Sequence, residues 1–341
     1  MPPAGATPLV TVLLLTFRQQ AFVRPALLSL LDQDYPNLEI LVLDDASPDR
    51  TLDIVREVLA EHPRSGCVRV MPAARNQGLA ANWNRGVAAA SGEILVAAAG
   101  DDVSHPGRVA AAAAYFAANP SVHALYFGCR IIDAAGSLRS AEWRPIAAPV
   151  TKTLGSGEMW KGFPFNGATA AYRAGCLRKF GPIDRRCGTE DVSSLMRAQM
   201  MGSAVVLPPV QVDWRWHGAN LSHGGVAGSV ERTARLRAKL RKAKGAYHDG
   251  AQLERDAHRA VELGLRPAGQ VAGLVAAARK MQAVARLKYH ALHPGSRWTV
   301  FAHLAGQVWR SSHFSLVERV ALTAKCFARR ALPGAVRQWG A

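Results

Sequence analysis

Two stretches of the sequence decide the fold: LEILVLDD at residues 38–45 and ILVAAAGDD at residues 94–102. In each stretch an apolar run with the length of a buried strand ends in two adjacent carboxylates, Asp44-Asp45 and Asp101-Asp102. In open α/β sheets ligands bind in the crevice at the carboxyl ends of the strands, so we expect these acids to face one crevice. A third acidic pair, Glu190-Asp191, follows farther along the chain.

The N-terminal part of the sequence alternates between short apolar runs and segments with helical spacing. The strand-like runs are residues 9–15, 38–43, 68–71 and 94–99, and the helix-like segments are residues 22–31, 51–60 and 78–90. This alternation is typical of βαβ units. It predicts an α/β fold with a mostly parallel sheet that carries helices on both faces.

The formal net charge of +17 is concentrated in the last third of the chain. Residues 1–229 hold 21 Lys and Arg against 19 Asp and Glu, a net of +2, whereas residues 230–341 hold 21 against 6, a net of +15. A glycine-rich run at residues 223–229 marks the change in composition. We therefore expect one domain at residues 1–225 and a basic α-helical extension at residues 226–341.

The cysteines and the apolar runs indicate a cellular compartment. The five cysteines are scattered and include no Cys-x-x-Cys pair, a pattern that favours a reduced cytoplasmic protein over a disulfide scaffold or a zinc module. The first apolar run, residues 9–15, is too short for a membrane span and has no basic residue before it, unlike a signal peptide. We expect a cytoplasmic protein without a transmembrane helix.

Several short segments occur in an order that is found in a known enzyme family. They are Thr16-Phe17-Arg18, Gln33-Asp34-Tyr35-Pro36, Val42-Leu43-Asp44-Asp45-Ala46-Ser47, Arg75-Asn76-Gln77-Gly78-Leu79, Asn84-Arg85-Gly86, Gly100-Asp101-Asp102, Gly188-Thr189-Glu190-Asp191, Trp214-Arg215-Trp216-His217-Gly218 and Asn220-Leu221-Ser222. The ordered set resembles the family 2 nucleotide-sugar glycosyltransferases of the GT-A fold, over roughly residues 8–225. The resemblance implies inverting transfer of a sugar from a UDP- or dTDP-sugar to a hydroxyl of a glycan or lipid-linked acceptor, in bacterial cell-surface polysaccharide synthesis.

The resemblance assigns donor binding to residues at the ends of the first strands and the segments after them. They are Thr16, Phe17, Asp44, Asp45, Arg75, Asn84 and Asp101. Asp44 and Asp45 are expected to contact the base and the ribose. An alternative stays open for these two acids, because one of them can cap the helix that begins near Thr51 or close an Asx turn through residues 47–49. An isolated arginine such as Arg75 is as readily a solvated surface residue.

A divalent cation is implied by the chemistry of the leaving group. Negative charge develops on the nucleoside diphosphate as its bond to the sugar breaks, and Mn²⁺ or Mg²⁺ held by carboxylate neutralises that charge. We predict Asp102 as the metal ligand, with Asp101 supporting it or meeting the ribose. The chain departs from the Asp-x-Asp-Asp pattern of the family, since Ala99 and Gly100 stand at the first two positions. His217 is then expected to complete the site.

The pair Glu190-Asp191 is the candidate for proton transfer. Inverting transfer needs a base that removes the proton of the acceptor hydroxyl, and the resemblance assigns this role to Asp191, with Glu190 orienting it or binding the acceptor. The alternative is a helix N-terminus at which Thr189 is the cap and the two acids favour the dipole. For the acceptor we expect contacts from the loop between Trp160 and Asn166.

The basic last third allows two interpretations. Residues 232–244 contain seven Lys and Arg in thirteen positions, and aromatic residues follow at helical spacing in residues 298–327. One interpretation is peripheral attachment to an anionic membrane at the inner face of the cytoplasmic membrane. The other is a helical appendage that packs on the catalytic domain or on a second copy of the chain.

Three other functions are compatible with parts of the sequence. A basic chain also suits nucleic-acid binding, but no reading motif accompanies the charge, so no nucleic acid is expected. A nucleotidyltransferase is disfavoured because residues 16–20, after the first strand, contain no glycine for a phosphate loop. A donor-binding protein without turnover remains an alternative because of Ala99.

Overall fold

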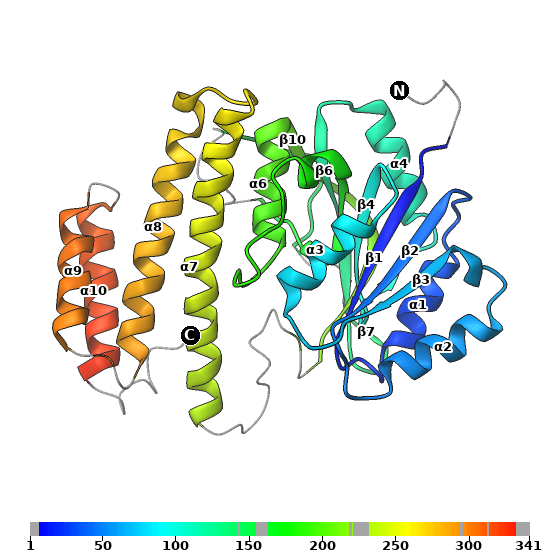
Figure 1. Cartoon of the computed structure of the whole chain (residues 1–341), viewed down its shortest axis with the longest axis horizontal. Helices are drawn as coiled ribbons and strands as arrows, with labels where there is room; N and C mark the ends of the chain where they lie inside the picture. Colours follow the sequence, from blue (N-terminus) through cyan, green and yellow to red (C-terminus); the bar gives the residue numbers. More distant parts are fainter. Residues whose placement is uncertain are drawn as a thin grey trace.

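The protein is described by a computed structural model for residues 7–141, 144–154, 163–217, 220, 232–293, 296, 298–311 and 314–331. The described strands form one ten-stranded sheet in the order β3-β2-β1-β4-β9-β6-β10-β5, with β7 on β6 and β8 on β10 (Figure 1). The strands are β1 (Val10–Thr16), β2 (Leu38–Asp44), β3 (Val68–Pro72), β4 (Ile94–Ala99), β5 (Val103–Ser104), β6 (Val122–Ile132), β7 (Leu138–Ser140), β8 (Val150–Thr153), β9 (Ala170–Arg173) and β10 (Ser203–Arg215).

The prediction of a mostly parallel sheet is confirmed. Strands β3, β2, β1 and β4 run parallel to one another, and β6 runs parallel to β10. Only β9, among the central strands, is antiparallel to both of its neighbours. Thr16 pairs with Asp44, and Leu15 pairs with Ala99, so β1, β2 and β4 end at the same edge of the sheet. The acids that follow β2 and β4 are therefore brought to one edge.

Helices cover both faces of the sheet, as predicted. One face packs against α1 (Val23–Leu31), α2 (Thr51–Glu61) and α4 (Arg108–Ala118), and the other packs against α3 (Leu79–Ala89), α5 (Ala174–Arg178) and α6 (Asp191–Met201). Because successive side chains of a strand point to opposite faces, Leu14 of β1 lies in the first core while Leu13 lies in the second, beside Trp83.

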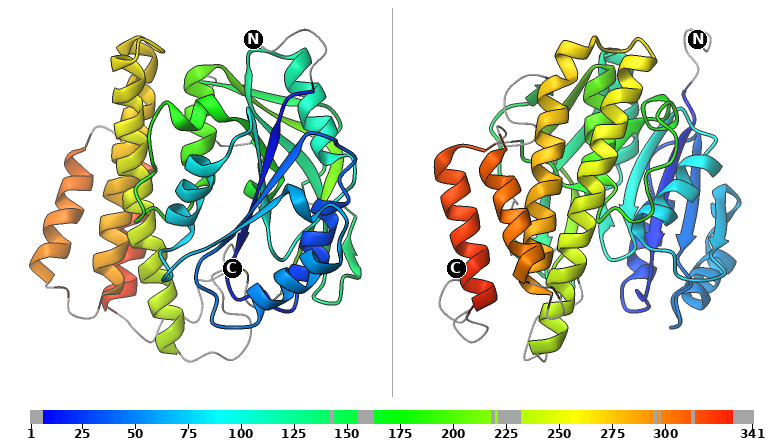
Figure 2. Two further views of the ribbon diagram at one scale, coloured as in Figure 1. Left: turned by 45° about the vertical axis from the view of Figure 1, so that its right-hand side comes forward. Right: turned by 60° about the vertical axis from the view of Figure 1, so that its left-hand side comes forward.

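The C-terminal part is helical. It consists of α7 (Arg232–Glu262), α8 (Ala268–Leu292), α9 (Trp298–Arg310) and α10 (Leu316–Ala331). Helices α7 and α8 lie side by side next to α6, and α9 and α10 lie on the far side of α8 from the sheet (Figures 1 and 2). Leu253 of α7 and Leu274 of α8 are buried in the same core as Leu195 of α6. The helix α7 thus shares a hydrophobic core with the sheet domain, while the boundary predicted after residue 225 falls outside the described residues.

None of the helices in the described ranges combines the length and the hydropathy that a membrane-spanning segment requires.

Candidate active site

Asp44 and Asp45 lie at the carboxyl end of β2, and both are buried. Asp44 Oδ1 accepts a hydrogen bond from Thr16 Oγ1 at 3.0 Å, and its Oδ2 accepts one from the Ser47 backbone N–H at 2.8 Å. This bond closes the turn after β2, in which Ala46 has a φ of 59°. The Asx turn before α2 is made by Asp49, whose Oδ1 accepts the Thr51 N–H at 3.2 Å, and not by Asp44 or Asp45. Asp44 therefore shapes the turn after β2.

Asp45 binds the start of α3 rather than the start of α2. Its Oδ1 accepts the backbone N–H of Gln77 and its Oδ2 accepts that of Gly78, both at 2.8 Å. Gly78 is the residue that caps α3, with a φ of 88° that favours glycine. The carboxylate thus joins the ends of β2 and of the segment after β3, and it fixes the wall of the crevice between them.

The other residues predicted for donor binding differ in solvent exposure and in hydrogen bonding. The Phe17 side chain is 39% exposed, and the Arg18 guanidinium lies 5.8 Å from the centre of its ring. Arg75 is exposed. Asn84 is fully engaged, because its amide donates to the Ile183 carbonyl at 2.7 Å and accepts the Ile183 N–H at 2.9 Å. Asn84 thereby ties α3 to the loop that precedes α6.

Asp101 and Asp102 follow β4 and point to different partners. Asp101 Oδ2 lies 2.9 Å from His217 Nε2, and both side chains keep partial exposure. Asp102 is buried, and its Oδ1 accepts the Arg215 backbone N–H at 2.8 Å. The pairing of His217 is thus with Asp101, whereas the sequence analysis had expected His217 to join Asp102.

The second oxygen of Asp102 is unusual. Asp102 Oδ2 is buried and has no hydrogen-bond partner among the described residues. Burial, and then the charge of Asp101, raise the pKa of Asp102 well above its ordinary value, while the Arg215 N–H and the guanidinium groups of Arg108 and Arg215 act in the opposite sense. A buried oxygen without a partner costs stability, and a cation at this point would remove that cost.

The donor atoms present suit a hard divalent cation. A carboxylate of Asp101, an imidazole of His217 and the unpartnered oxygen of Asp102 are ligand types that Mn²⁺ accepts. Within the ranges that the structure describes, no three His, Cys, Asp or Glu side chains converge as a metal-binding group. A cation here would therefore rely on one or two protein ligands and on phosphate oxygens, as Mg²⁺ commonly does.

Gly100 and Gln19 form a feature that the motif comparison missed. A methyl group added to Gly100 would lie 2.3 Å from Gln19 Oε1 and 2.8 Å from Thr16 Cγ2. Gln19 Oε1 is itself buried without a hydrogen-bond partner among the described residues. The end of β1 thus approaches the turn after β4 so closely that a larger residue at position 100 would have to displace the side chains of Gln19 and Thr16. The sole signal in the sequence was the departure from the acidic pattern at Ala99 and Gly100.

Glu190 and Asp191 begin α6 and are partly buried. Glu190 occupies the N-cap position but makes no capping hydrogen bond through its side chain, and its Oε2 is buried without a partner. Asp191 Oδ1 accepts the Val192 N–H at 2.7 Å. The alternative in which Thr189 is the cap is therefore wrong, because Glu190 takes the N-cap position and only Asp191 lies in the first turn of the helix.

The surroundings of this pair favour protonation. Burial, then the charge of Asp191 and, more weakly, that of Asp249 raise the pKa of Glu190 to about 8. Burial also raises the pKa of Asp191. The neighbouring hydroxyl groups of Tyr126 and Tyr172, which lie 3.2 Å apart, supply no positive charge. A carboxylate with a raised pKa is suited to accept a proton near neutral pH.

The residue predicted to contact the acceptor lies beside the predicted base. Asn166 Oδ1 accepts the Ala168 N–H at 3.1 Å and so starts the short turn at Gly167–Thr169. A methyl group added to Gly167 would lie 3.2 Å from Asp191 Oδ2, which brings this turn into contact with Asp191. Trp160, the other acceptor prediction, lies outside the described residues.

One arginine connects the two acidic pairs. Arg108 is buried, and its Nη2 donates to the carbonyls of Ala97 in β4 at 2.7 Å and of Ala168 at 2.8 Å. Burial lowers the pKa of Arg108 to about 10, while the charge of Asp102 opposes that change. The turn that contacts Asp191 is therefore fixed to the strand that presents Asp101 and Asp102, and both acidic pairs lie around the end of β4.

The sequence and the fold were compared with known proteins. The sequence model of the family described as Glycosyl transferase family 2 matches residues 11–180. EpsE of Bacillus subtilis (strain 168), a glycosyltransferase by name, is 28% identical over 194 residues, which are 56% of this chain and 66% of EpsE, just under two thirds of that protein. The uncharacterized glycosyltransferase alr2836 of a Nostoc species is 24% identical over 240 residues, 68% of this chain and 72% of that protein.

Solved structures share the fold. Residues 1–349 of TarS from S. aureus, crystallised with UDP-GlcNAc, superpose with a TM-score of 0.55 at 15% identity, over 97% of this chain and 93% of that one. At this identity the likeness concerns the fold alone, and it extends over the C-terminal helices as well as the sheet. The family match and the named relatives lead to one conclusion: the chain belongs to the family 2 glycosyltransferases.

Proposed function

We propose that this protein is an inverting glycosyltransferase that moves a sugar from a nucleoside diphosphate, UDP or dTDP being favoured, to a hydroxyl group of a glycan or lipid-linked acceptor. The observation that carries the proposal is the pair Glu190-Asp191, whose pKa values are raised and which adjoins the turn at Gly167. Such a pair can take a proton from an alcohol at neutral pH.

In the proposed reaction Asp191 removes the proton of the acceptor hydroxyl. The oxygen then forms a bond to the anomeric carbon from the face opposite the donor phosphate, the bond from that carbon to the phosphate oxygen breaks, and the nucleoside diphosphate leaves with the electron pair. Glu190, protonated at neutral pH because of its raised pKa, orients the acceptor by donating a hydrogen bond. The acceptor lies between Asp191 and the turn that Asn166 begins.

The donor occupies the edge formed by β1, β2 and β4. Asp45 and Asp44 shape the pocket for the base and ribose, and Phe17 and Arg75, which are exposed beside it, contact the bound nucleotide. Mn²⁺ or Mg²⁺ would be held by Asp101 and His217, with the unpartnered oxygen of Asp102 behind them. When bound, the cation neutralises charge on the diphosphate.

Association with an anionic membrane belongs to the same proposal, because a lipid-linked acceptor is found there. A cavity of about 370 Å³ lies between α8 and α10. Its lining combines cations with apolar groups: Lys280, Val284, Lys288, Phe314, Glu318, Ala321, Leu322 and Lys325. Beside it Trp298, Trp309 and Phe327 are 48%, 41% and 55% exposed. Lysines and exposed aromatics on one helical surface suit the headgroup region of an anionic bilayer.

The catalytic proposal is tested by measuring release of nucleoside diphosphate from a panel of UDP-, dTDP- and GDP-sugars, with Mn²⁺, with Mg²⁺ and with EDTA. We expect turnover of a UDP- or dTDP-sugar that EDTA abolishes. Tight donor binding without turnover, measured by calorimetry, would instead favour the donor-binding alternative suggested by Ala99. Failure to bind any donor of the panel contradicts the proposal.

The membrane proposal needs point substitutions, because removal of the basic third would also remove the buried face of α7. Lys288→Glu with Lys325→Glu should weaken sedimentation with vesicles of phosphatidylcholine and phosphatidylglycerol by about tenfold or more, since each lysine near an anionic surface contributes about 1 kcal/mol. The matched control is Lys152→Glu with Lys179→Glu, on the sheet domain. Equal binding by the two double variants would contradict the proposal.

A further inference from the structure

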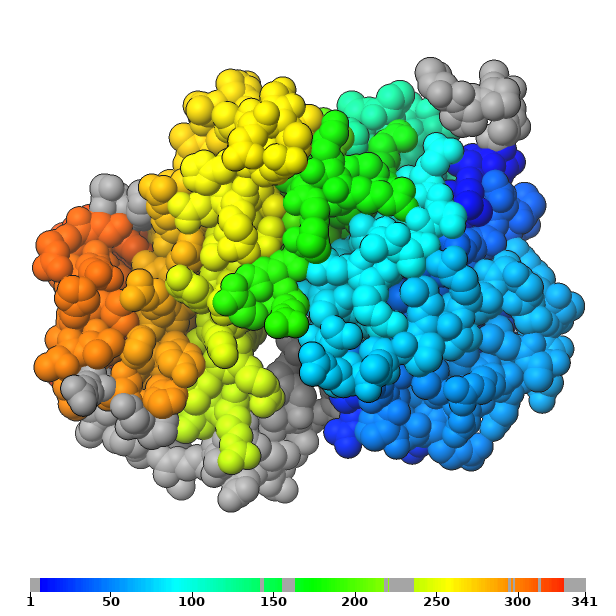
Figure 3. Space-filling view, viewed as in Figure 1, coloured from blue at the N-terminus to red at the C-terminus, as the bar shows by residue number. Residues whose placement is uncertain are grey.

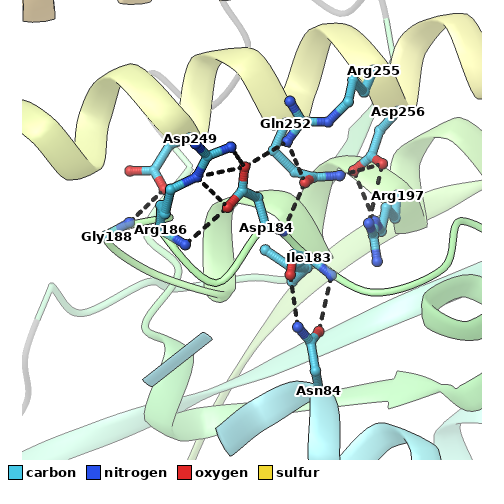
Figure 4. Close-up of polar contacts among 10 residues, drawn as sticks. All are labelled: Asn84, Ile183, Asp184, Arg186, Gly188, Arg197, Asp249, Gln252, Arg255 and Asp256. Atoms are coloured by element: carbon cyan, nitrogen blue, oxygen red, sulfur yellow. Dashed lines mark hydrogen bonds and ion pairs between the residues drawn. The ribbon is translucent and has the colours of Figure 1, made fainter. Parts of the chain in front are cut away.

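One face of α7 carries polar residues and a glycine that meet α6 and the loop before it. Gly245, Asp249, Gln252 and Asp256 are spaced by four, three and four residues, so they form one stripe along the helix. Figure 4 shows Asp249, Gln252 and Asp256 of this stripe above the loop at residues 183–188. In Figure 3 the green segment that contains the loop lies between the yellow α7 and the cyan α3.

Asp249 is the centre of the contact. Its side chain is buried, its Oδ1 accepts the Gly188 N–H at 2.8 Å, and its carboxylate also accepts the Thr189 N–H and the Cys187 thiol. These three donors immediately precede Glu190 and Asp191. The first N–H groups of a helix and of the residues before it have no partner within the helix, and here a carboxylate from α7 supplies one.

The backbones of the loop and of α7 are in direct contact at this point. A methyl group added to Gly245 would lie 2.8 Å from Gly188 Cα, so a larger residue at position 245 would push the loop away. Two glycines facing each other let Asp249, one turn farther along α7, reach the loop with its short side chain.

The start of the loop is fixed as well. Gln252 accepts the Asp184 N–H at 2.8 Å and donates to Asp256 at 2.8 Å. Asp256 forms a buried two-bond ion pair with Arg197 of α6, at 2.8 and 3.1 Å, and Arg197 also donates to the carbonyl of Gly181 at 2.8 Å. The loop is therefore held near its start by Gln252 of α7 and Arg197 of α6, and at its end by Asp249 of α7.

We propose that Asp249 is a positioning residue that fixes the segment Cys187–Thr189 and thereby holds Asp191 against the turn at Gly167. The inference rests on the proposed role of Asp191 as the base. It makes α7, which lies in the part of the chain that the family match does not cover, a component of the catalytic machinery.

The charge of Asp249 gives the proposal a second consequence. Glu190 is faced by Asp191 on its own helix, by Asp249 from α7, by Tyr126 from β6 and by Tyr172 from β9. Asp249 is the only one of these that is a carboxylate on another element. Removal of its charge should lower the pKa of Glu190, because a like charge disfavours ionisation.

The test compares Asp249→Ala and Asp249→Asn with the control Glu262→Ala, which lies on the exposed end of α7. Asp249→Ala should lower kcat by about tenfold to a hundredfold, because a small displacement of a catalytic group costs that much, while the donor KM stays within about twofold. Asp249→Asn keeps an oxygen for the Gly188 N–H and should recover part of kcat, with the alkaline limb of its pH profile moved to lower pH because activity needs Glu190 protonated. The control should match the wild type.

Two results would overturn the inference: a kcat of Asp249→Ala within about twofold of the wild type, or equal losses of kcat in the two Asp249 variants together with pH profiles that match that of the wild type. Hydrogen exchange at the Gly188 and Thr189 amides is measured on the same proteins and should speed up in Asp249→Ala. If the wild type fails to turn over any donor, the proposed function fails, and unchanged exchange at these amides would separately refute the anchoring by Asp249.

Discussion

The two acidic pairs around the end of β4 differ in the residues that surround them and in the charges of those residues. Asp101-Asp102 lies among cationic groups, since Arg108 and Arg215 act on Asp102 and His217 contacts Asp101. Glu190-Asp191 lies among Tyr126, Tyr172 and Asp249, none of which carries positive charge. Burial raises a carboxyl pKa in both pairs, that of Asp102 in the first and those of Glu190 and Asp191 in the second, but only in the first do guanidinium groups oppose the rise.

Asp191→Asn tests the contrast between the two acidic pairs most directly. If Asp191 is the base, the amide cannot take the acceptor proton, and transfer should fall by about a thousandfold while donor affinity changes little. Transfer is measured by product formation and donor affinity by calorimetry. A loss of donor affinity with unchanged transfer at saturating donor would show that Asp191 binds the donor, as proposed for the first pair, and is not the base.

The next largest effect concerns stability and the support of the second pair. Asp256→Ala leaves Arg197 buried, with 2% of its side chain exposed, and without its carboxylate partner. The free energy of unfolding, measured with denaturant, should fall by about 3–5 kcal/mol. The control on the same helix is Glu254→Ala, which breaks the more exposed pair with Arg279 and should cost no more than about 1 kcal/mol. Equal losses of unfolding free energy in the two variants would show that the buried ion pair stabilises the protein no more than the exposed one.

A third experiment addresses the first pair. His217→Ala removes the partner of Asp101 and should raise the Mn²⁺ concentration needed for half-maximal activity by about tenfold to a hundredfold, with a smaller change in kcat at saturating metal. His62→Ala, which breaks a pair with Asp32 away from the sheet edge, is the matched control. An unaltered metal dependence would remove His217 from the proposed site.

The smallest effect is a pH dependence of stability. Because the pKa of Glu190 is raised to about 8, the folded protein binds a proton that the unfolded chain releases above about pH 4.5, so the wild type loses stability as pH rises through this window. Glu190→Gln removes the titration, so its stability should fall less than that of the wild type between pH 5 and pH 8. Thermal unfolding at the two pH values measures the difference. A difference independent of pH contradicts the assignment, and Glu262→Gln should show none.

The first half of the fold could be predicted from the sequence because its strands are continuous apolar runs. Residues 38–43 and 94–99, buried on both faces, stand out from the helical segments between them. The antiparallel strand β9 was not predicted, since its four residues at Ala170–Arg173 resemble any short apolar segment and only pairing with β4 and β6 gives them an orientation. Strand direction inside a sheet is a tertiary property.

The candidate site was predictable as a set of positions but not as a set of contacts. Asp101 and Asp102 are neighbours in a turn, and only the folded backbone decides which of them meets His217. The hydrogen bonds between Asn84 and Ile183 join residues 99 positions apart, and no pattern in either segment predicts them. Asp249 was hidden for the same reason, because an acid in a basic helix looks like a solvated charge until the helix is packed.

The contact between Asp249 and Gly188 spans 61 positions of the chain, and its order has a consequence during synthesis. Synthesis runs from the N-terminus, so the ribosome makes the loop before α6 earlier than the helix that anchors it. The nascent polypeptide therefore holds Glu190 and Asp191 before it holds the residue that we propose positions them. The loop can reach its anchored conformation only after α7 has been made and packed.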